Sequence, residues 1–341
     1  MIIRSQSYAR AGLIGNPSDG YYGKTISFIV RNYVAEVELW ESPEIEILPA
    51  ARDHSVFPSL SALSRDVAWF GYYGGVRLLK ATVKRFYDYC VECGIELADR
   101  NFTLRYQSDV PSQVGMAGSS AIITAALRAL MAFYGVTIPK AVQAKLILSV
   151  ENDELNIPAG LQDRVIQAYE GVVFMDFDRD TMERQGYGIY EELEPSLLPP
   201  LYIAFHDQLS EGTEVFHNDI RSRFNRGDQE VIDAMQEWAG LAQQTRDLLV
   251  AGRGEEIGPL LDANFDLRKK LYRISEGNLR MVETARATGA TAKFTGSGGA
   301  IVGTYEDDAM FERLVTSLEP LGMKVIRPQI EPVEPTQVPV S

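Results

Sequence analysis

The stretch PSQVGMAGSSA, residues 111–121, has a composition that suits phosphate binding. Gly115 and Gly118 carry no side chain, so an anion can approach their backbone closely. Ser119 and Ser120 add hydroxyls where an apolar helix is expected to begin, and a helix N-terminus presents backbone N–H groups without partners. We therefore expect a polyphosphate site here. An N-capped core helix after a loop would give the same pattern, and no lysine follows the glycines as in the Walker loop.

A second glycine-rich stretch is KFTGSGGAIVG, residues 293–303, with four glycines around a serine and a threonine. A tight turn between two strands explains two of these glycines. The grouping of Gly296, Ser297, Gly298 and Gly299 also suits close approach by a ligand or by another loop.

Two acidic residues lie in the segment SVENDELNIPAGLQDRV, residues 149–165. The pattern places Glu151 near the end of one helix and Asp163 at the start of another element. Two carboxylates brought together by a short excursion can serve as metal ligand and proton acceptor. Surface charge is the alternative for each, and Arg164 can simply be the ion-pair partner of Asp163.

Composition narrows the class of protein. A chain of 341 residues is long for one core, so two domains are expected. The net charge of −14 opposes nucleic-acid binding, although a local cluster of backbone donors can still bind a small anion. The chain shows no signal-peptide pattern and no run near the roughly 18 apolar residues of a membrane span, so a soluble cytoplasmic protein is expected. Cys90 and Cys93 are expected to be free thiols or, alternatively, a disulfide or redox pair.

Hydrophobic spacing predicts strands and helices in both halves of the chain, which indicates an α+β protein with two lobes. Strands are expected at residues 7–16, 24–42, 44–50, 102–108, 171–177, 201–207 and 323–330, and a strand–turn–strand at 291–305. Helices are expected at residues 74–93, 119–134, 139–155 and 308–318, and within 228–287. Residues 191–200 are the expected linker, and residues 331–341 are expected to be disordered.

The glycine-bearing segments resemble, in this order, the three motifs of the GHMP kinase superfamily, which includes galactokinase and mevalonate kinase. RAGLIGNPSDGYYG, residues 10–23, resembles the first motif, PSQVGMAGSSA the second and KFTGSGGAIVG the third. Within the superfamily the chain is most similar to the glucuronokinases. Their segments are also resembled by three stretches of this chain, GNPSDGYYGKTISF, GGVRLLKA and NIPAGLQDRV. The second motif has one residue more before its serines than the usual G-L-G-S-S form, a spacing that glucuronokinases share.

The resemblance implies a two-lobed GHMP kinase fold of the α+β class. The N-terminal lobe, residues 1–190, would bind ATP and contain a left-handed βαβ crossover, against the usual right-handed rule. The C-terminal lobe, residues 200–330, would be ferredoxin-like. Nucleotide and acceptor would meet between the lobes.

The resemblance also implies roles for individual residues in an ATP- and Mg²⁺-dependent kinase. Asp163 would accept the proton of the acceptor hydroxyl or orient it, and Arg10 would stabilise charge on the transferring phosphoryl group. Ser120 and Glu151 would hold Mg²⁺. The implied nucleotide contacts are Gly115, Ala117, Gly118, Ser119, Ser120, Gly296, Ser297 and Gly298.

The first motif bears on the acceptor. Galactokinases carry G-E-H-T-D-Y where this chain has GNPSDGY, so Asp19 is retained while Asn16 replaces a glutamate. Loss of that negative charge suits an acceptor with its own carboxylate, although Asn16 can equally be a turn residue before Pro17. The candidate acceptor-binding residues are Asn16, Asp19, Tyr21 and Arg164. The arginine for the carboxylate is open among Arg31, Arg52, Arg105 and Arg164.

We therefore expect ATP-dependent phosphorylation of a sugar hydroxyl, with D-glucuronate and its 1-phosphate as the leading pair. A GHMP kinase acting on another sugar or a heptose phosphate is the enzymatic alternative. A catalytically silent, ligand-sensing relative is a third reading, against which the retention of Glu151 and Asp163 argues. The expected ligands are ATP, Mg²⁺ and a small sugar, with no nucleic-acid or membrane partner and with the oligomeric state open.

Overall fold

The structure is a computed structural model that describes residues 2–50, 53, 58–61, 63, 74–112, 114–206 and 214–330, with residues 214–219 described by their backbone. Contacts between residues define two compact units. The first unit comprises Met1–Ala9, Tyr33–Val110 and Ala117–Ala168, and the second comprises Arg10–Asn32, Pro111–Met116 and Tyr169–Ser341. The long strands β1 (Ile2–Ile14) and β2 (Lys24–Ser42), which pair with each other, contribute residues to both units.

In the first unit, a sheet is built on residues 35–42 of β2. They pair antiparallel with β4 (Asn101–Ser108), and β3 (Glu46–Leu48) pairs parallel with β4. Buried Val37 and Leu39 alternate with the more exposed Glu36 and Glu38, so one face of β2 faces the core. Because β3 and β4 are parallel and a helix lies between them in sequence, they form the expected βαβ unit, whose left-handedness stays a prediction.

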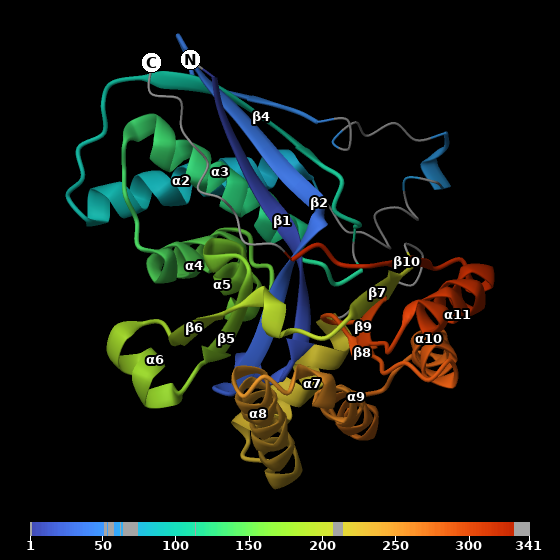
Figure 1. The fold of residues 1–341 in the computed structure, drawn as a ribbon. Coiled ribbons are helices and arrows are strands. Elements are labelled where there is room, and N and C mark those ends of the chain that lie inside the picture. Colours follow the sequence, from blue (N-terminus) through green and yellow to red (C-terminus); the bar gives the residue numbers. More distant parts are fainter. Residues whose placement is uncertain are drawn as a thin grey trace. The chain divides into compact units, whose positions relative to one another are not determined.

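Helices α2 (Gly75–Glu92) and α3 (Gly118–Tyr134) lie side by side in the first unit (Figure 1). Helix α2 buries one stripe, which includes Leu78 and Phe86, whereas α3 is apolar on nearly all sides and buries most of its length. Gly135, in the left-handed region with φ of 68°, ends α3 as expected. Next come α4 (Lys140–Ser149), a π-helical turn (Val150–Glu154) and α5 (Leu161–Tyr169).

In the second unit, residues 24–28 of β2 pair with β5 (Val172–Asp176), which pairs with β6 (Ile189–Leu193). The expected linker at residues 191–200 is therefore partly wrong. Its first three residues belong to β6 because their backbone groups pair with residues 172–174. The proposed division into lobes at 1–190 and 200–330 stays a prediction.

The second unit also holds a four-stranded antiparallel sheet in the order β10-β7-β9-β8. Its strands are β7 (Leu201–Phe205), β8 (Lys293–Phe294), β9 (Ala300–Thr304) and β10 (Lys324–Ile326). Helices connect β7 to β8 and β9 to β10, which gives the βαββαβ connectivity of the expected ferredoxin-like arrangement. These and the preceding helix are α6 (Arg179–Gln185), α7 (Glu214–Asn225), α8 (Gln229–Val250), α9 (Gly258–Leu271), α10 (Glu276–Ala287) and α11 (Asp308–Leu318).

Short side chains cap four of these helices, and Asp178 does so at α6 by accepting from the Thr181 N–H at 3.0 Å. Asp228, Ser275 and Asp307 each accept a hydrogen bond from a backbone N–H of the first turn, at α8, α10 and α11. Such caps satisfy amides that have no partner inside the helix. Ala117, which precedes α3, makes no such side-chain hydrogen bond.

Three further expectations concern the C-terminal tail, the cysteines and membrane-spanning helices. The expected disordered tail, residues 331–341, and Arg52 lie outside the described residues. Both cysteines are free thiols, Cys90 buried and Cys93 exposed, so the disulfide alternative is wrong. Within the described ranges, no helix combines the length and apolar character that crossing a membrane requires.

Candidate active site

The start of α3 presents backbone donors in the first unit. Ala117 precedes the helix in the left-handed region with φ of 62°, and its methyl side chain makes no cap hydrogen bond. The first-turn amides, from Gly118 onward, therefore have no acceptor within the helix. Ser120 is buried, and its Oγ donates to the Ala117 carbonyl at 3.2 Å. This geometry leaves a partial positive charge at the point where the second motif was expected to bind phosphate.

Glu151 lies in the π-helical turn of the first unit and is only 2% exposed. Arg164 of α5 donates to Glu151 Oε2 from Nε at 2.7 Å and also from Nη2. Burial raises the pKa of Glu151, and the Arg164 guanidinium opposes that rise. The two side chains thus form a buried ion pair across 13 residues of sequence.

Asp163 shares the same arginine, because Arg164 Nη1 lies 3.2 Å from Asp163 Oδ2. One helical turn beyond Asp163 on α5, Gln167 donates from Nε2 to the carbonyls of Tyr8 and Ala117, each at 3.0 Å. Residues four apart lie on one helix face, so this face of α5 is anchored at the residue that precedes α3. The first unit therefore brings the start of α3 and the two acidic residues into one neighbourhood.

In the second unit, Arg10 connects the loop before α3 to the third motif. Its Nη1 donates to the carbonyls of Gly115 at 2.5 Å and Thr295 at 3.1 Å. Its backbone N–H donates to the carbonyl of Met116 at 3.2 Å. Thr295 Oγ1 also donates to the Gly115 carbonyl, at 3.2 Å. The beginning of the second motif and the third motif are therefore held together, as the sequence order had suggested.

Glycine is required at this contact. Gly115 has φ of 68°, and a Cβ there would lie 3.0 Å from the Gly298 carbonyl oxygen. A Cβ on Gly296 would lie 2.8 Å from the Gly115 carbonyl oxygen and 3.2 Å from both terminal nitrogens of Arg10. The two loops can approach this closely only because neither carries a side chain at these positions.

A buried lysine, Lys293, donates hydrogen bonds to the turn of the first motif. Lys293 Nζ donates to the Gly12 carbonyl at 2.7 Å and to Asn16 Oδ1 at 2.5 Å. Burial, followed by the positive charges of Arg268 and Arg10, lowers the pKa of Lys293 well below its usual range.

Asn16 uses both ends of its side chain in this network. Its Nδ2 lies 3.4 Å from the Gly296 carbonyl, while its backbone carbonyl accepts from Asn264 of α9 at 3.2 Å. Asn264 also accepts from the Gly15 N–H at 2.7 Å. These contacts agree with the alternative that Asn16 is a turn residue before Pro17. Direct contact of Asn16 with a sugar stays a prediction.

Tyr21, a candidate acceptor-binding residue, lies beside aromatic and cationic side chains of the second unit. Its ring meets that of Phe224 edge to face at 4.9 Å, and the Arg221 guanidinium lies over it at 4.2 Å. Burial raises the pKa of Tyr21, and Arg221 is the main opposing influence; Asp19 and Tyr272 also act on it. Asp19 and Tyr21 therefore share one neighbourhood.

Sequence reasoning missed the face of α9 that supports these motifs. Arg268 donates to the carbonyls of Gly296 at 2.9 Å and Ser297 at 3.1 Å, and its guanidinium lies over Tyr272. Asn264 and Arg268 are four residues apart, so they share one buried face of the helix, and the buried Tyr272 directly follows its last residue. That spacing was the available signal, but polar residues at helical spacing usually indicate a solvent face.

The residues fit Mg²⁺ in the way this ion is usually held. Within the described residues, no three His, Cys, Asp or Glu side chains form a group that could hold a metal. Mg²⁺ commonly takes one or two carboxylates and completes its shell with waters and substrate phosphates. Both hydrogen bonds of the Glu151 carboxylate use Oε2, so Oε1 makes none with a described residue. One carboxylate oxygen is thus available, near a helix start suited to phosphate.

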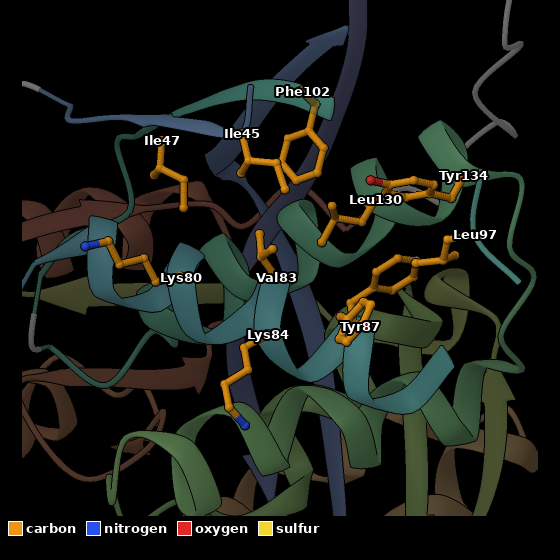
Figure 2. Close-up of a pocket in the computed structure, with 11 residues that line it drawn as sticks. Ile45, Ile47, Lys80, Val83, Lys84, Tyr87, Leu97, Phe102, Leu130 and Tyr134 are labelled. Atoms are coloured by element: carbon orange, nitrogen blue, oxygen red, sulfur yellow. The ribbon is translucent and has the colours of Figure 1, made fainter. Parts of the chain in front are cut away.

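A separate cavity of about 340 Å³ lies in the first unit. Figure 2 shows the side chains that line it. It is mainly apolar, with Ile45, Val83 and Phe102 among its walls and Lys80 and Lys84 at its side. Its α3 residues, Leu130 and Tyr134, lie three to four turns beyond Gly118, about 18 to 24 Å along the helix axis. The cavity is therefore distinct from the expected phosphate site.

Comparisons with known proteins agree with the three motifs. Residues 77–171 match the family described as GHMP kinases N terminal domain. The chain is 45% identical over 308 residues to probable glucuronokinase 2 of Arabidopsis thaliana, which covers 88% of this chain and 84% of the relative. It is 43% identical over 306 residues to glucuronokinase 1 of the same plant, with the same coverage.

A solved structure agrees as well. The galactokinase of Lactococcus lactis complexed with galactose superposes with a TM-score of 0.74, covering 96% of this chain and 93% of that chain. At 16% identity this likeness shows the fold alone. The identity to the two Arabidopsis proteins extends over most of both chains, and on that ground the chain belongs to the GHMP kinase family.

Proposed function

We propose that this chain is an ATP-dependent sugar kinase that transfers the γ-phosphoryl group of ATP to the anomeric hydroxyl of D-glucuronate. The products are glucuronate 1-phosphate and ADP. The observation that carries the choice of substrate is the 43–45% identity to two proteins named as glucuronokinases over 88% of the chain.

The start of α3 supports the nucleotide half of this proposal. Its first-turn amides, which have no acceptor inside the helix, favour a phosphate group. The loop around Gly115, which Arg10 and Thr295 fix, leads into that helix. Arg10 is the residue that we assign to charge on the transferring group. When bound, Mg²⁺ would neutralise charge on the phosphates, with Glu151 Oε1 and Ser120 Oγ as its proposed protein ligands.

Asp163 supports the acceptor half. In the proposed step the sugar hydroxyl oxygen forms a bond to the γ-phosphorus, the bond to the β-γ bridging oxygen breaks, and the hydroxyl proton passes to Asp163. The guanidinium of Arg164, 3.2 Å away, holds this carboxylate in place. Kinases work mainly by positioning groups and balancing charge, so a carboxylate held at fixed orientation suits the task.

The setting of the enzyme is part of the proposal. A cytoplasmic location suits an enzyme that consumes ATP, and the two free thiols agree with a reducing compartment. The net charge of −14 argues against a nucleic-acid partner.

The test is a substrate panel with the full chain, ATP and Mg²⁺. The panel contains D-glucuronate, D-galacturonate, D-galactose, D-glucose, a heptose 7-phosphate and mevalonate, with ADP release as the readout and ³¹P NMR to identify the phosphorylated carbon. We expect turnover on D-glucuronate with a product phosphorylated at the anomeric carbon.

Two outcomes would overturn the proposal. Turnover on galactose, mevalonate or the heptose phosphate without turnover on any uronate would assign another kinase activity. Binding of ATP and sugar, measured by calorimetry, without ATP consumption with any acceptor would assign a ligand-sensing role.

A further inference from the structure

Arg221 of α7 lies directly on the turn that carries the candidate acceptor-binding residues. Its guanidinium carbon is 4.2 Å from the centroid of the Tyr21 ring. Its Nη2 would be 3.0 Å from a Cβ placed on Gly20, so the guanidinium also reaches the backbone of the turn. A cation over an aromatic face is attracted to it, and Phe224, one turn along α7, packs against the same ring. These contacts fix the guanidinium beside Asp19 and Tyr21.

The charge of Arg221 is not neutralised within the part of the chain that the structure describes. No ion pair with a described carboxylate forms at Arg221, and its side chain is exposed. Its neighbour Arg223 is different, because it pairs with Asp228 at 2.7 Å and also with Glu230. Arg221 therefore keeps guanidinium donors available on its solvent side.

Of the arginines considered for a carboxylate, Arg105 and Arg164 are engaged, whereas Arg52 lies outside the described residues. Arg105 pairs with Glu38 on the surface of the first unit, and Arg164 forms the buried pair with Glu151. In the second unit, Arg268 is buried and uses two terminal nitrogens on the carbonyls of Gly296 and Ser297. Arg221 differs in being both close to Asp19 and available.

We propose that Arg221 binds the carboxylate of an acidic sugar and so makes the enzyme selective for hexuronates over neutral hexoses. This inference rests on the proposed sugar kinase activity. A guanidinium presents parallel N–H donors that match the two oxygens of a carboxylate. Asp19, as an acceptor of hydrogen bonds, suits the sugar hydroxyls. A neutral hexose has a hydroxymethyl group in place of the carboxylate and gains little from Arg221.

The experiment compares D-glucuronate with D-glucuronamide, in which a neutral amide replaces the carboxylate. KM and kcat are measured for the full-length wild type and for Arg221→Leu and Arg221→Lys. We expect Arg221→Leu to raise KM for D-glucuronate about 10- to 100-fold, from the loss of hydrogen bonds to a charged group. KM for D-glucuronamide and kcat should change far less, and Arg221→Lys should recover part of the affinity for the acid.

Arg226→Leu is the matched control, since Arg226 is an exposed arginine five residues further on that bonds Ser222 Oγ instead. It should leave both KM values unchanged.

If the wild type turns over D-glucuronate and Arg221→Leu keeps its KM, the inference falls and the proposed function stands. Equal increases of KM for the acid and the amide would also overturn it, because Arg221 would then only support the turn. A wild type without turnover on any uronate removes the proposed function and the inference with it.

Discussion

Arg164 donates to the carboxylate of Glu151 from two nitrogens, inside the first unit, with both side chains almost fully buried. The same guanidinium lies 3.2 Å from Asp163. One guanidinium thus contacts both Glu151, to which the family resemblance assigns metal binding, and Asp163, to which it assigns the acceptor hydroxyl. Loss of either partner of a buried pair leaves an uncompensated charge, so the pair also contributes to stability.

Glu151→Gln separates the structural role of Glu151 from the metal-binding role. Loss of the carboxylate leaves Arg164 buried without its counter-charge, which costs about 3–5 kcal/mol and lowers Tm on the order of 10 °C. If Oε1 also holds Mg²⁺, the Mg²⁺ concentration for half-maximal activity should rise at least about tenfold. Thermal unfolding and Mg²⁺ titration of the initial rate measure the two effects.

Arg164→Met is the matched comparison for Glu151→Gln. It breaks the same ion pair and should lower Tm similarly, but it leaves the Glu151 carboxylate in place. Asp153→Asn changes an exposed acid of the same turn and should change neither quantity. An equal Mg²⁺ requirement in all three variants and the wild type would show that Glu151 acts through Arg164 alone.

Gly115→Ala should reduce kcat/KM for ATP about 10- to 100-fold, because the new methyl group displaces the loop before α3. Gly115 has φ of 68°, and its Cβ would lie 3.0 Å from the Gly298 carbonyl oxygen. Gly135→Ala is the control, since Gly135 has the same φ but nothing within 4 Å of the added Cβ. Each variant should lose roughly 1–2 kcal/mol of stability from the backbone conformation. A similar kcat/KM for ATP in both variants would disprove a role of the loop contact in nucleotide binding.

Most of the fold followed from local periodicity. The buried helix α3, the amphipathic α2 and the alternating strand β2 each have one dominant apolar pattern, and each was predicted. Strand β6 was missed in part, because the acidic pair Glu191 and Glu192 in its sequence IYEEL resembles a polar linker. Its strand character depends on pairing with β5, which is a tertiary property.

The candidate site was predictable only where its residue types indicate an unusual backbone conformation. The glycines and serines of the three motifs do so, and their segments do meet, in the second unit, around Arg10 and Thr295. Lys293 stood within the third motif but received no role, because a lysine is rarely fully buried. Asn264 belongs to a helix that no motif marks, so its contact with the first-motif turn could come only from the structure.

Asp163→Asn should lower kcat about 10²- to 10⁴-fold while the affinities for ATP and D-glucuronate stay close to those of the wild type. The amide keeps the shape of the side chain but cannot take a proton from the acceptor hydroxyl. Calorimetry gives the affinities, and ADP release gives kcat. Asp153→Asn serves as the surface control. A kcat within a few-fold of the wild type would leave Asp163 with a structural role beside Arg164.

Lys293→Met should change how stability depends on pH. Burial and two nearby arginines lower the pKa of Lys293 well below 10.5, whereas the unfolded chain regains the ordinary value. Between these two pKa values the unfolded state binds the extra proton, so raising the pH favours the folded wild type. The variant lacks this group and also leaves two buried acceptors without a donor, at a cost of about 1–3 kcal/mol. Its Tm should therefore lie below that of the wild type at neutral pH, and the gap should widen as the pH rises from about 7 to about 10.

Lys269→Met, at an exposed pair with Glu283, should show no such widening. A gap that narrows or stays constant would mean that Lys293 is charged in the folded protein.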